Sequence, residues 1–335
     1  MKSSIVLGSV LLSASVLAGC GSNSGNDDPI PPFAGVYTPR TATADVNSVA
    51  AAYAASPRLQ SGAAPVLRAF GNPTVSSLGE AASIELEKTA DGYILRYDDE
   101  SVSFTDADLI VEDDGFDYYQ GAGGSISAVR GSGTTAELES TTSAMVPLQY
   151  FINTNSQGQV TDGVSDGQAQ GYTVFGLETA GANMPRTGTA TYTGRSRIDA
   201  YARETTGDPL AVGRIRYTGD ATMSADFGAG TVAGEIDVTL RRTATEGGVQ
   251  TPNADISAAG AVIGLAQTRI IGNGFETNLV NNDAANLIMA ADGISADTEA
   301  SAVGRFYGNN AGEVGAVVAG EGTSHVITGF VTGAQ

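Results

Sequence analysis

Side chains that carry metal and redox chemistry are nearly absent from this sequence of 335 residues. It has one cysteine, Cys20, and one histidine, His325. A lone cysteine excludes a disulfide within the chain. Zinc sites and iron–sulfur clusters built from cysteine and histidine need several such ligands, so the sequence predicts neither.

Tryptophan is absent, aromatic residues make up only 7% of the chain, and positive charges are scarce. The 17 Lys and Arg against 37 Asp and Glu give a formal net charge of −20. A surface this acidic repels phosphate backbones, so we expect no nucleic-acid partner. The charge is typical of an exported, soluble protein; an acidic face that steers a basic partner is the alternative.

The amino terminus has the pattern of an export signal. Lys2 supplies a positive charge, and residues 5–16 form an apolar segment shorter than the roughly 20 residues of a membrane span. The segment ends in Leu17-Ala18-Gly19-Cys20, which resembles the lipobox of bacterial lipoproteins. The resemblance implies that residues 1–19 are a signal peptide and that Cys20 carries acyl chains such as palmitate, which anchor the protein to a membrane. An ordinary signal peptide with a chance cysteine is the alternative.

Residues 20–32 combine the cysteine with a run of Gly, Ser, Asn and Asp and then a proline cluster. This composition is typical of a flexible tether that stiffens toward its end. Gly21, rather than Asp, follows the cysteine, which in lipoproteins of enteric bacteria favours transfer to the outer membrane. We therefore expect a lipid-anchored outer-membrane protein that is exposed at the cell surface.

The remainder contains 44 glycines and many small and hydroxyl side chains, a composition that favours an all-β fold. Residues 33–165 form the first predicted domain. A short helix is predicted over residues 46–55, where apolar residues recur at helical spacing. Residues 84–88 and 93–97 alternate apolar and polar side chains around an Asp-Gly turn, which predicts a β-hairpin. Further strands are expected at residues 102–104, 109–111 and 116–119.

Two acidic clusters, residues 98–100 and 112–114, stand at predicted strand ends. Ca²⁺ takes six to eight oxygen ligands and could use them, but solvated turns are the commoner explanation. Residues 153–158 faintly resemble the start of an EF-hand loop, but Val164 stands where the closing glutamate belongs, so we reject that site. The polar, turn-rich residues 155–170 predict a linker or long loop. The sequence thus predicts no metal site.

Beyond residue 170 the alternation of apolar and polar side chains becomes regular. Residues 221–227 place apolar side chains on one face and hydroxyl or acidic side chains on the other, and residues 232–240 repeat the pattern after a glycine-rich turn. Six to eight antiparallel strands with one polar face hide their edges by closing into a barrel. Later strands are expected at residues 261–271, 300–307, 314–319 and 325–331.

Two motifs in this region resemble those of the transferrin-binding protein B-like surface lipoproteins. Met184-Pro185 followed by Gly188-Thr189-Ala190-Thr191-Tyr192-Thr193-Gly194 is similar to the opening of the family's barrel domain. The segment that begins Gly304-Arg305-Phe306-Tyr307-Gly308 is similar to the family's closing signature. It departs from that signature at Asn309, which replaces the usual proline, and at Ala316, which replaces the second glycine. Residues 172–179 fit the strand that leads into the barrel.

The resemblance implies an eight-stranded antiparallel β-barrel over residues 170–335, with residues 33–165 as a handle-like, mainly β domain. We expect Phe306 and Tyr307 to project to opposite faces of their strand. A turn should follow at residues 308–311, and a glycine at position 315 should allow a close strand approach. The motif therefore marks the fold and identifies no binding site.

Characterised members of the family bind macromolecules or haem at the bacterial surface. The resemblance implies a surface lipoprotein that binds a macromolecular, haem-containing or iron-containing ligand for nutrient capture, with a TonB-dependent receptor as a further partner. A structural or host-interaction envelope lipoprotein without a role in iron uptake is the alternative. A carboxylate-dependent glycoside hydrolase needs neither histidine nor cysteine, but no acidic pair lies in a recognisable motif. We therefore expect no enzyme and no catalytic residue.

His325 shares a predicted strand face with apolar residues as far as Val331. A lone imidazole can ligate haem, which makes His325 the candidate contact for a haem cofactor. Tyr118 and Tyr119 are the alternative haem or partner contacts. A surface or hydrogen-bonded histidine and ordinary strand aromatics are the commoner explanations, so we expect no resident cofactor.

Overall fold

The structure is a computed structural model, and it describes residues 178–206, 214–243 and 252–335 throughout. The signal peptide with Cys20, the rest of the tether, the acidic residues 98–99 and 112–114, and residues 155–166 of the expected linker lie outside the described residues. The described residues before position 178 are 42–43, 49–55, 67–70, 74–75, 84–89, 92–97, 100–111, 116–121, 123–129, 145–154 and 167–176.

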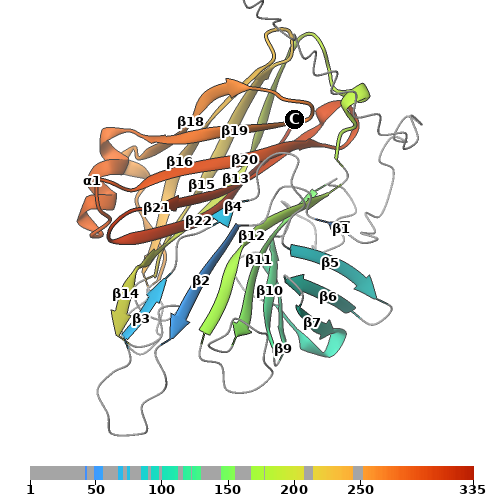
Figure 1. Cartoon of the computed structure of the whole chain (residues 1–335). Helices are drawn as coiled ribbons and strands as arrows, with labels where there is room; N and C mark the ends of the chain where they lie inside the picture. Colours follow the sequence, from blue (N-terminus) through green and yellow to red (C-terminus); the bar gives the residue numbers. More distant parts are fainter. Residues whose placement is uncertain are drawn as a thin grey trace, which may run out of the picture.

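Eight antiparallel strands close into a barrel in the carboxy-terminal half of the chain (Figure 1). They are β13 (Thr189–Ala202), β15 (Arg214–Asp226), β16 (Thr231–Thr243), β18 (Val262–Arg269), β19 (Gly274–Asn281), β20 (Glu299–Tyr307), β21 (Glu313–Glu321) and β22 (His325–Ala334). Their order is β15-β13-β22-β21-β20-β19-β18-β16, and β16 pairs again with β15, which closes the ring. A short strand, β17 (Ala254–Asp255), is added to β16. The expected all-β fold with an eight-stranded barrel is confirmed.

The hairpin of β15 and β16 shows how the sequence builds the barrel wall. Ala221, Met223 and Ala225 face the interior and are buried, whereas Thr222 and Ser224 between them are exposed. The chain turns through a glycine at position 230 with a φ of +66°, a conformation that glycine adopts without steric cost. Burial of one face contributes roughly 25 cal/mol per Å² of apolar surface. It also fixes the register, because a slip of one residue would turn that face to solvent.

Aromatic side chains fill one end of the barrel interior. The ring centroid of Phe306 lies 5.8 Å from those of Tyr192 and Phe227 and 6.0 Å from that of Phe275. Tyr307 points the other way, into an apolar cluster outside the barrel. The expectation that neighbours 306 and 307 project to opposite faces is therefore confirmed.

The opening and closing motifs of the barrel meet in space. The hydroxyl of Tyr192 donates a hydrogen bond of 2.7 Å to the carbonyl oxygen of Ala311, and Gln335 Nε2 donates to the same oxygen at 2.9 Å. Ala311 ends the short 3₁₀ turn η4 (Asn309–Ala311), which follows Gly308 with its φ of +72°. The expected turn is confirmed, and these contacts show both motifs in a structural role.

The handle, by which we mean strands β1 to β12 together with β14, contains two antiparallel sheets. The first has the order β1-β5-β6-β7 and consists of β1 (Ala42–Thr43), β5 (Ile84–Thr89), β6 (Gly92–Tyr97) and β7 (Glu100–Thr105). The second has the order β14-β3-β2-β12-β11-β10-β9-β8, with β4 on β2. Its strands are β2 (Val49–Ala55), β3 (Leu67–Phe70), β4 (Thr74–Val75), β8 (Leu109–Val111), β9 (Phe116–Gly121), β10 (Gly124–Val129), β11 (Met145–Thr154), β12 (Gly167–Gly176) and β14 (Glu204–Thr206).

The predicted hairpin at residues 84–97 is confirmed as β5 and β6, and the three further strands lie in β7, β8 and β9. The helix predicted over residues 46–55 is wrong. Residues 49–55 form β2, which pairs with β12 on one side and with β3 and β4 on the other. This segment is rich in alanine, whose small side chain fits a helix or a strand. Its backbone pairs with other strands on both sides, and this pairing makes it a strand.

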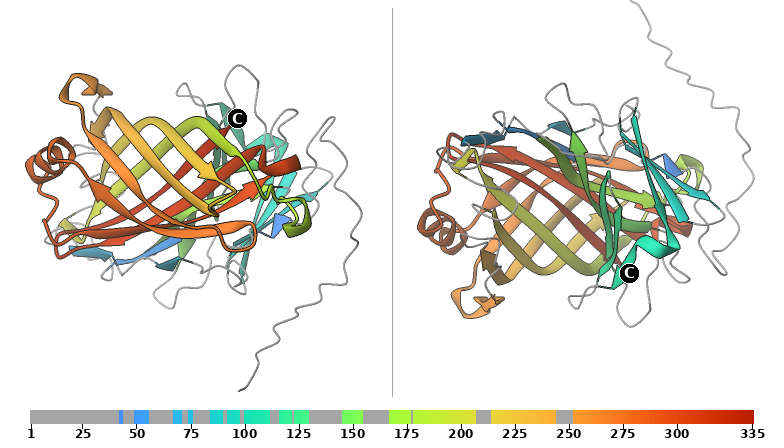
Figure 2. Two further views of the ribbon diagram at one scale, coloured as in Figure 1. Left: turned by 90° about the horizontal axis from the view of Figure 1, so that it is seen from above. Right: turned by 90° about the horizontal axis from the view of Figure 1, so that it is seen from below.

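Two segments connect the handle to the barrel through the backbone. β12 pairs with β11 and β2, so its hydrogen bonds place it in the handle sheet. The prediction of a linker over residues 155–170 is therefore wrong for residues 167–170, which belong to this strand. The domain division at residues 165–170 stays a prediction. β14 continues β13 beyond Arg203 and pairs with β3, so one run of chain contributes to both sheets. Figure 2 shows the handle strands lying along one side of the barrel.

An apolar cluster joins the handle to the outer wall of the barrel. Tyr172 of β12 packs on Phe330 of β22, with ring centroids 5.5 Å apart. A Cβ on the glycine at position 315 would lie 2.7 Å from Met145 Sδ and 2.8 Å from a methyl of Val174. The close approach expected at that glycine is therefore made by handle side chains, and any larger residue would push the two sheets apart.

A buried ion pair lies beside this cluster. Asp199 of β13 accepts hydrogen bonds from Arg216 of β15, with Nε–Oδ1 at 2.8 Å and Nη2–Oδ2 at 3.0 Å. The hydroxyls of Tyr172 and Tyr201 donate to Asp199 Oδ2 at 2.7 and 3.0 Å, and Gln149 Nε2 donates at 3.2 Å. Since Gln149 and Tyr172 belong to the handle, one carboxylate binds groups from both parts of the molecule.

The surroundings of Asp199 keep it ionised. Burial alone would raise its pKa, but the adjacent Arg216 guanidinium and its hydrogen bonds lower the pKa well below the usual range of a carboxyl group. Burial and the negative charge of Asp199 raise the pKa of Tyr201 well above its usual value. The tyrosines therefore stay protonated and act as donors.

Candidate functional site at the barrel mouth

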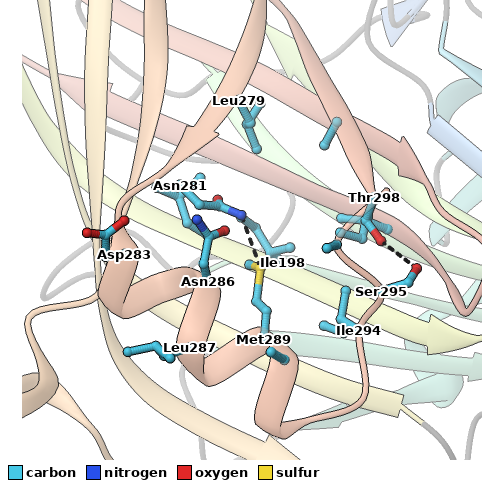
Figure 3. Close-up of a pocket in the computed structure, with 15 residues that line it drawn as sticks. Ile198, Leu279, Asn281, Asp283, Asn286, Leu287, Met289, Ile294, Ser295 and Thr298 are labelled. Carbon is cyan, nitrogen blue, oxygen red and sulfur yellow. Dashed lines mark hydrogen bonds between the residues drawn. The ribbon is translucent and has the colours of Figure 1, made fainter.

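A cavity of about 640 Å³ lies at the end of the barrel opposite the aromatic cluster (Figure 3). We call this end the mouth. Barrel strands form the inner wall, and the outer wall comes from α1 (Asp283–Ala291), which connects β19 to β20, and from the segment after it. The lining residues are Ile198, Ile263, Leu279, Asn281, Asp283, Asn286, Leu287, Met289, Ala290, Ile294, Ser295, Ala296, Thr298, Ala300 and Ile327.

Small side chains at interior positions create this space. From the mouth inward, the interior positions of β20 are Ala300, Ala302, a glycine and then Phe306. The glycine at position 320 of β21 also lies near the mouth, and a Cβ there would be 2.6 Å from the Cβ of Ala300. The aromatic rings thus fill one end of the barrel, while the other end depends on α1 to cover it.

α1 begins and ends at residues with clear helix-terminal roles. The side chain of Asn282 caps the helix by accepting a 2.8 Å hydrogen bond from the amide of Ala285. A glycine at position 293, with a φ of +80°, redirects the chain two residues after the helix. Ala285 and Met289 are buried, whereas Leu287 is 72% exposed. No helix that the structure describes is long and apolar enough to cross a membrane.

An ion pair fixes the end of α1 to the barrel wall. The carboxylate of Asp292, only 3% exposed, pairs with Arg241 of β16, whose Nε donates at 2.7 Å. The hydroxyl of Tyr217 donates to Asp292 Oδ2 at 2.5 Å. Burial, together with the hydrogen bond to Asp292, raises the pKa of Tyr217 well above its usual value. These bonds hold the helix across the mouth without filling the space beneath it.

Polar groups in the cavity lie near its rim and carry little charge. Asn281 Nδ2 donates to Met289 Sδ at 3.3 Å, and the hydroxyls of Ser295 and Thr298 are 3.3 Å apart. Asp283 is the only charged residue among those that line the cavity. The lining can therefore hold an apolar group and offer hydrogen bonds at its edge.

His325 lies near the mouth but does not line the cavity. It is 7% exposed, and its Nδ1 is 2.9 Å from Ser324 Oγ, which also accepts a hydrogen bond from the amide of Ser295. Burial lowers the pKa of His325, so the neutral imidazole is favoured. The cavity lining has no histidine, cysteine or tyrosine, and its one sulfur ligand, Met289, already accepts a hydrogen bond from Asn281. These residues do not fit an axially ligated haem, and the assignment to His325 stays a prediction.

The tyrosines considered with His325 lie elsewhere. Tyr119 of β9 is 3% exposed and packs edge-on against Tyr93, with ring centroids 5.6 Å apart at 76°. The side chain of Tyr118 lies outside the described part of the chain. Within the described ranges, no group of three or more His, Cys, Asp or Glu side chains could hold a metal ion.

The sequence reasoning missed β19 and α1, and with them this cavity. A signal for the helix was present: Asn282 and Asp283 precede the run Ala-Ala-Asn-Leu-Ile-Met-Ala-Ala, and Asp292 with a glycine follows it. The inner wall had no local signal, because Ile198 and Ile327 come from strands far apart in the sequence.

Residues 184–335 match the family model of the C-lobe and N-lobe β-barrels of Tf-binding protein B. The barrel is a transferrin-binding protein B-type domain. The resemblance of its opening and closing motifs is thereby confirmed. A comparison with curated proteins finds no match to the chain.

Solved structures similar to the chain include members of the same group. The chain is 16% identical to a transferrin-binding protein B mutant from Haemophilus parasuis, over 86% of this chain and 45% of that one, with a TM-score of 0.42. It is 11% identical to transferrin-binding protein B of Neisseria meningitidis, over 86% and 63%, with a TM-score of 0.40. The N-lobe of lactoferrin-binding protein B of Moraxella bovis is 16% identical, over 64% and 80%, with a TM-score of 0.32. The chain thus spans about half the length of the first of these proteins.

Proposed function

We propose that the protein is a surface lipoprotein, anchored to the outer membrane through Cys20, that binds a macromolecular ligand carrying iron or haem for nutrient capture. The match of residues 184–335 to the barrels of Tf-binding protein B carries this proposal. A TonB-dependent receptor is the partner that would accept the captured nutrient.

The way the barrel is held supports a binding role. Asp199 and the apolar cluster around Tyr172 fix the barrel to the handle. The closed ring of strands leaves the connecting loops at its two ends free to carry binding residues. A rigid barrel that presents loops suits recognition of a large partner, because little order has to be gained on binding.

The test is capture on intact cells. Cells that express the chain are incubated with iron-loaded transferrin, with haemoglobin or with no bait, and the bound protein is quantified against cells that display an unrelated lipid-anchored protein. We expect enrichment of a carrier, protease-sensitive exposure of the chain, and loss of both with Cys20→Ala. No enrichment over the anchored control would contradict the nutrient-capture role and favour the structural or host-interaction alternative.

Two exposed apolar residues at opposite ends of the barrel provide a matched pair of variants. Leu287 on α1 is 72% exposed, and Ile271 in the turn between β18 and β19 is 65% exposed. Loss of carrier binding in only one of Leu287→Asp and Ile271→Asp identifies the end that contacts the ligand. A Soret titration with haemin, repeated on His325→Ala, tests the haem assignment, and identical spectra would rule out His325 as a ligand.

A further inference from the structure

The cavity beneath α1 has the size and lining of a small-molecule site. Its volume of about 640 Å³ falls within the roughly 300–1,000 Å³ of ligand pockets, which are lined mostly by apolar side chains. Ile198, Ile263 and Ile327 form the inner wall and are each at most 4% exposed, so they lie inside the barrel. Met289 and Ile294 line the cavity from the helix and from the segment after it. An apolar body in this space would contact side chains on both sides.

The charges around the cavity indicate which kind of ligand fits. None of the lining residues is Lys or Arg, and Asp283 contributes a negative charge at the start of α1. Two arginines at this end of the barrel are already paired, Arg241 with Asp292 and Arg203 with Glu321. The whole chain carries a net charge of −20. An anionic head group would therefore be repelled and would find no cation in the lining.

Uncharged polar groups at the rim can bind the head of a neutral ligand. The amide of Asn281 donates to a thioether sulfur, which is a weak acceptor, so a ligand oxygen would replace it favourably. Ser295 and Thr298 contribute hydroxyls, and Asn286 contributes an exposed amide on α1. Figure 3 shows Asn281 and Asn286 toward one side of the cavity and Ser295 and Thr298 toward the other.

A gap in the barrel wall gives a ligand a way in. The pairing of β19 with β20 ends at Asn278↔Ser301, before the mouth is reached. A second cavity, of about 570 Å³, lies at this gap and shares Leu279, Thr298 and Ala300 with the first. A chain-like molecule can therefore reach the barrel interior from the side, without moving α1.

We propose that the cavity beneath α1 binds a neutral amphiphile, with an apolar chain inside the barrel and an uncharged hydrogen-bonding head at the rim. This is a small-molecule binding activity in addition to capture of a macromolecule. It depends on the residues of the mouth alone and not on the identity of the carrier.

The test is a fluorescence titration of the chain from residue 20 onward with Cys20→Ser, so that no acyl group of the protein competes. The probe is N-phenyl-1-naphthylamine, which is neutral and apolar. Monopalmitoylglycerol and palmitate at pH 8 serve as competitors with the same chain and different head groups. We expect saturable binding of one probe per chain, with displacement by the glyceride at least roughly tenfold more effective than by the anion.

Three tryptophan variants locate the site. Leu279→Trp fills the space shared by the two cavities, and Asn286→Trp blocks the rim from an exposed helix position that leaves the barrel core unchanged. Val280→Trp is the matched control, because Val280 is 58% exposed and lines neither cavity. We expect a loss of roughly tenfold or more in affinity for the first two and less than about twofold for the control.

Other outcomes would overturn the proposal. Probe binding that does not saturate, or that is equal in all three variants, would show that the cavity is not the binding site. Displacement of the probe by palmitate as effectively as by monopalmitoylglycerol would show that the cavity does not select a neutral amphiphile. Should Leu279→Trp fail to fold, the comparison of Asn286→Trp with Val280→Trp decides. Carrier capture on cells is measured separately with the same variants, so the failure of one proposal is distinguished from the failure of the other.

Discussion

Replacing Asp199 with alanine should be among the most damaging single substitutions in the protein. The carboxylate is fully buried and accepts hydrogen bonds from Arg216, Tyr172, Tyr201 and Gln149. Its removal leaves the Arg216 guanidinium, itself 9% exposed, without its counter-charge. Breaking a buried pair in this way costs about 3–5 kcal/mol, a large share of the roughly 5–15 kcal/mol that stabilises a domain.

The measurement is urea unfolding followed by circular dichroism, with Glu321→Ala as the control. Glu321 pairs with Arg203 at 3.1 Å, but its side chain is 52% exposed, so its loss should cost less than about 1 kcal/mol. The double variant Asp199→Leu with Arg216→Met removes both charges, so its free energy of unfolding should lie above that of Asp199→Ala. It should stay below that of the parent protein, because the buried hydroxyls of Tyr172 and Tyr201 lose their acceptor.

The same group predicts how stability depends on pH. The pKa of Asp199 is lower in the folded chain than in the unfolded chain, because Arg216 favours the charged form. The stability that Asp199 contributes is therefore fully present above its pKa in the unfolded chain, about 4. This stability is lost as the pH falls toward the lower pKa of Asp199 in the folded chain. The loss of stability between about pH 5 and pH 3 should be smaller in Asp199→Asn than in the parent. A cost for Asp199→Ala no larger than that of Glu321→Ala, with an unchanged pH profile, would refute the reasoning.

Three further predictions concern the barrel and its mouth. Gly329→Ala should lower the free energy of unfolding by more than about 2 kcal/mol, since the added Cβ would lie 2.4 Å from a backbone oxygen, whereas Gly181→Ala meets nothing within 4 Å and should be neutral in the same urea titration. The single imidazole of His325 should titrate by NMR below its usual value of 6.5, because burial disfavours the charged form; a midpoint at or above 6.5 would contradict this. Asp292→Ala should lower the free energy of unfolding by about 1–3 kcal/mol, because the buried hydroxyl of Tyr217 loses its acceptor, while Arg241 is 30% exposed and can be solvated. Hydrogen exchange should become faster only in α1, and unchanged exchange would show that the ion pair does not hold the helix.

Strands with one buried face were the elements that the sequence predicted best. In residues 221–226 of β15 and 235–238 of β16, buried apolar residues alternate with exposed polar ones. The hairpin of β5 and β6 was readable for the same reason, and its turn residues marked where the chain reverses. The segment 49–55 was misread because alanines lack such a contrast, and its structure depends on partners from β3, β4 and β12.

Contacts between strands that are far apart in the sequence could not be predicted from the pattern of apolar and polar residues. The parity of β13 places Ile198 inside and Asp199 outside, but nothing local shows that Asp199 meets Tyr172 of the handle. The cavity likewise depends on barrel closure, which brings Ile198 and Ile327 to face α1. Only the helix-terminal residues around α1 were available as a local signal for the site.

The run of chain that begins as β13 and continues as β14 has a consequence for how the molecule melts. Because this run pairs with β15 and β22 in the barrel and then with β3 in the handle, neither sheet can come apart without disturbing the other. Calorimetry should therefore show one cooperative transition, with a van't Hoff enthalpy equal to the calorimetric enthalpy, in place of two separate melting events.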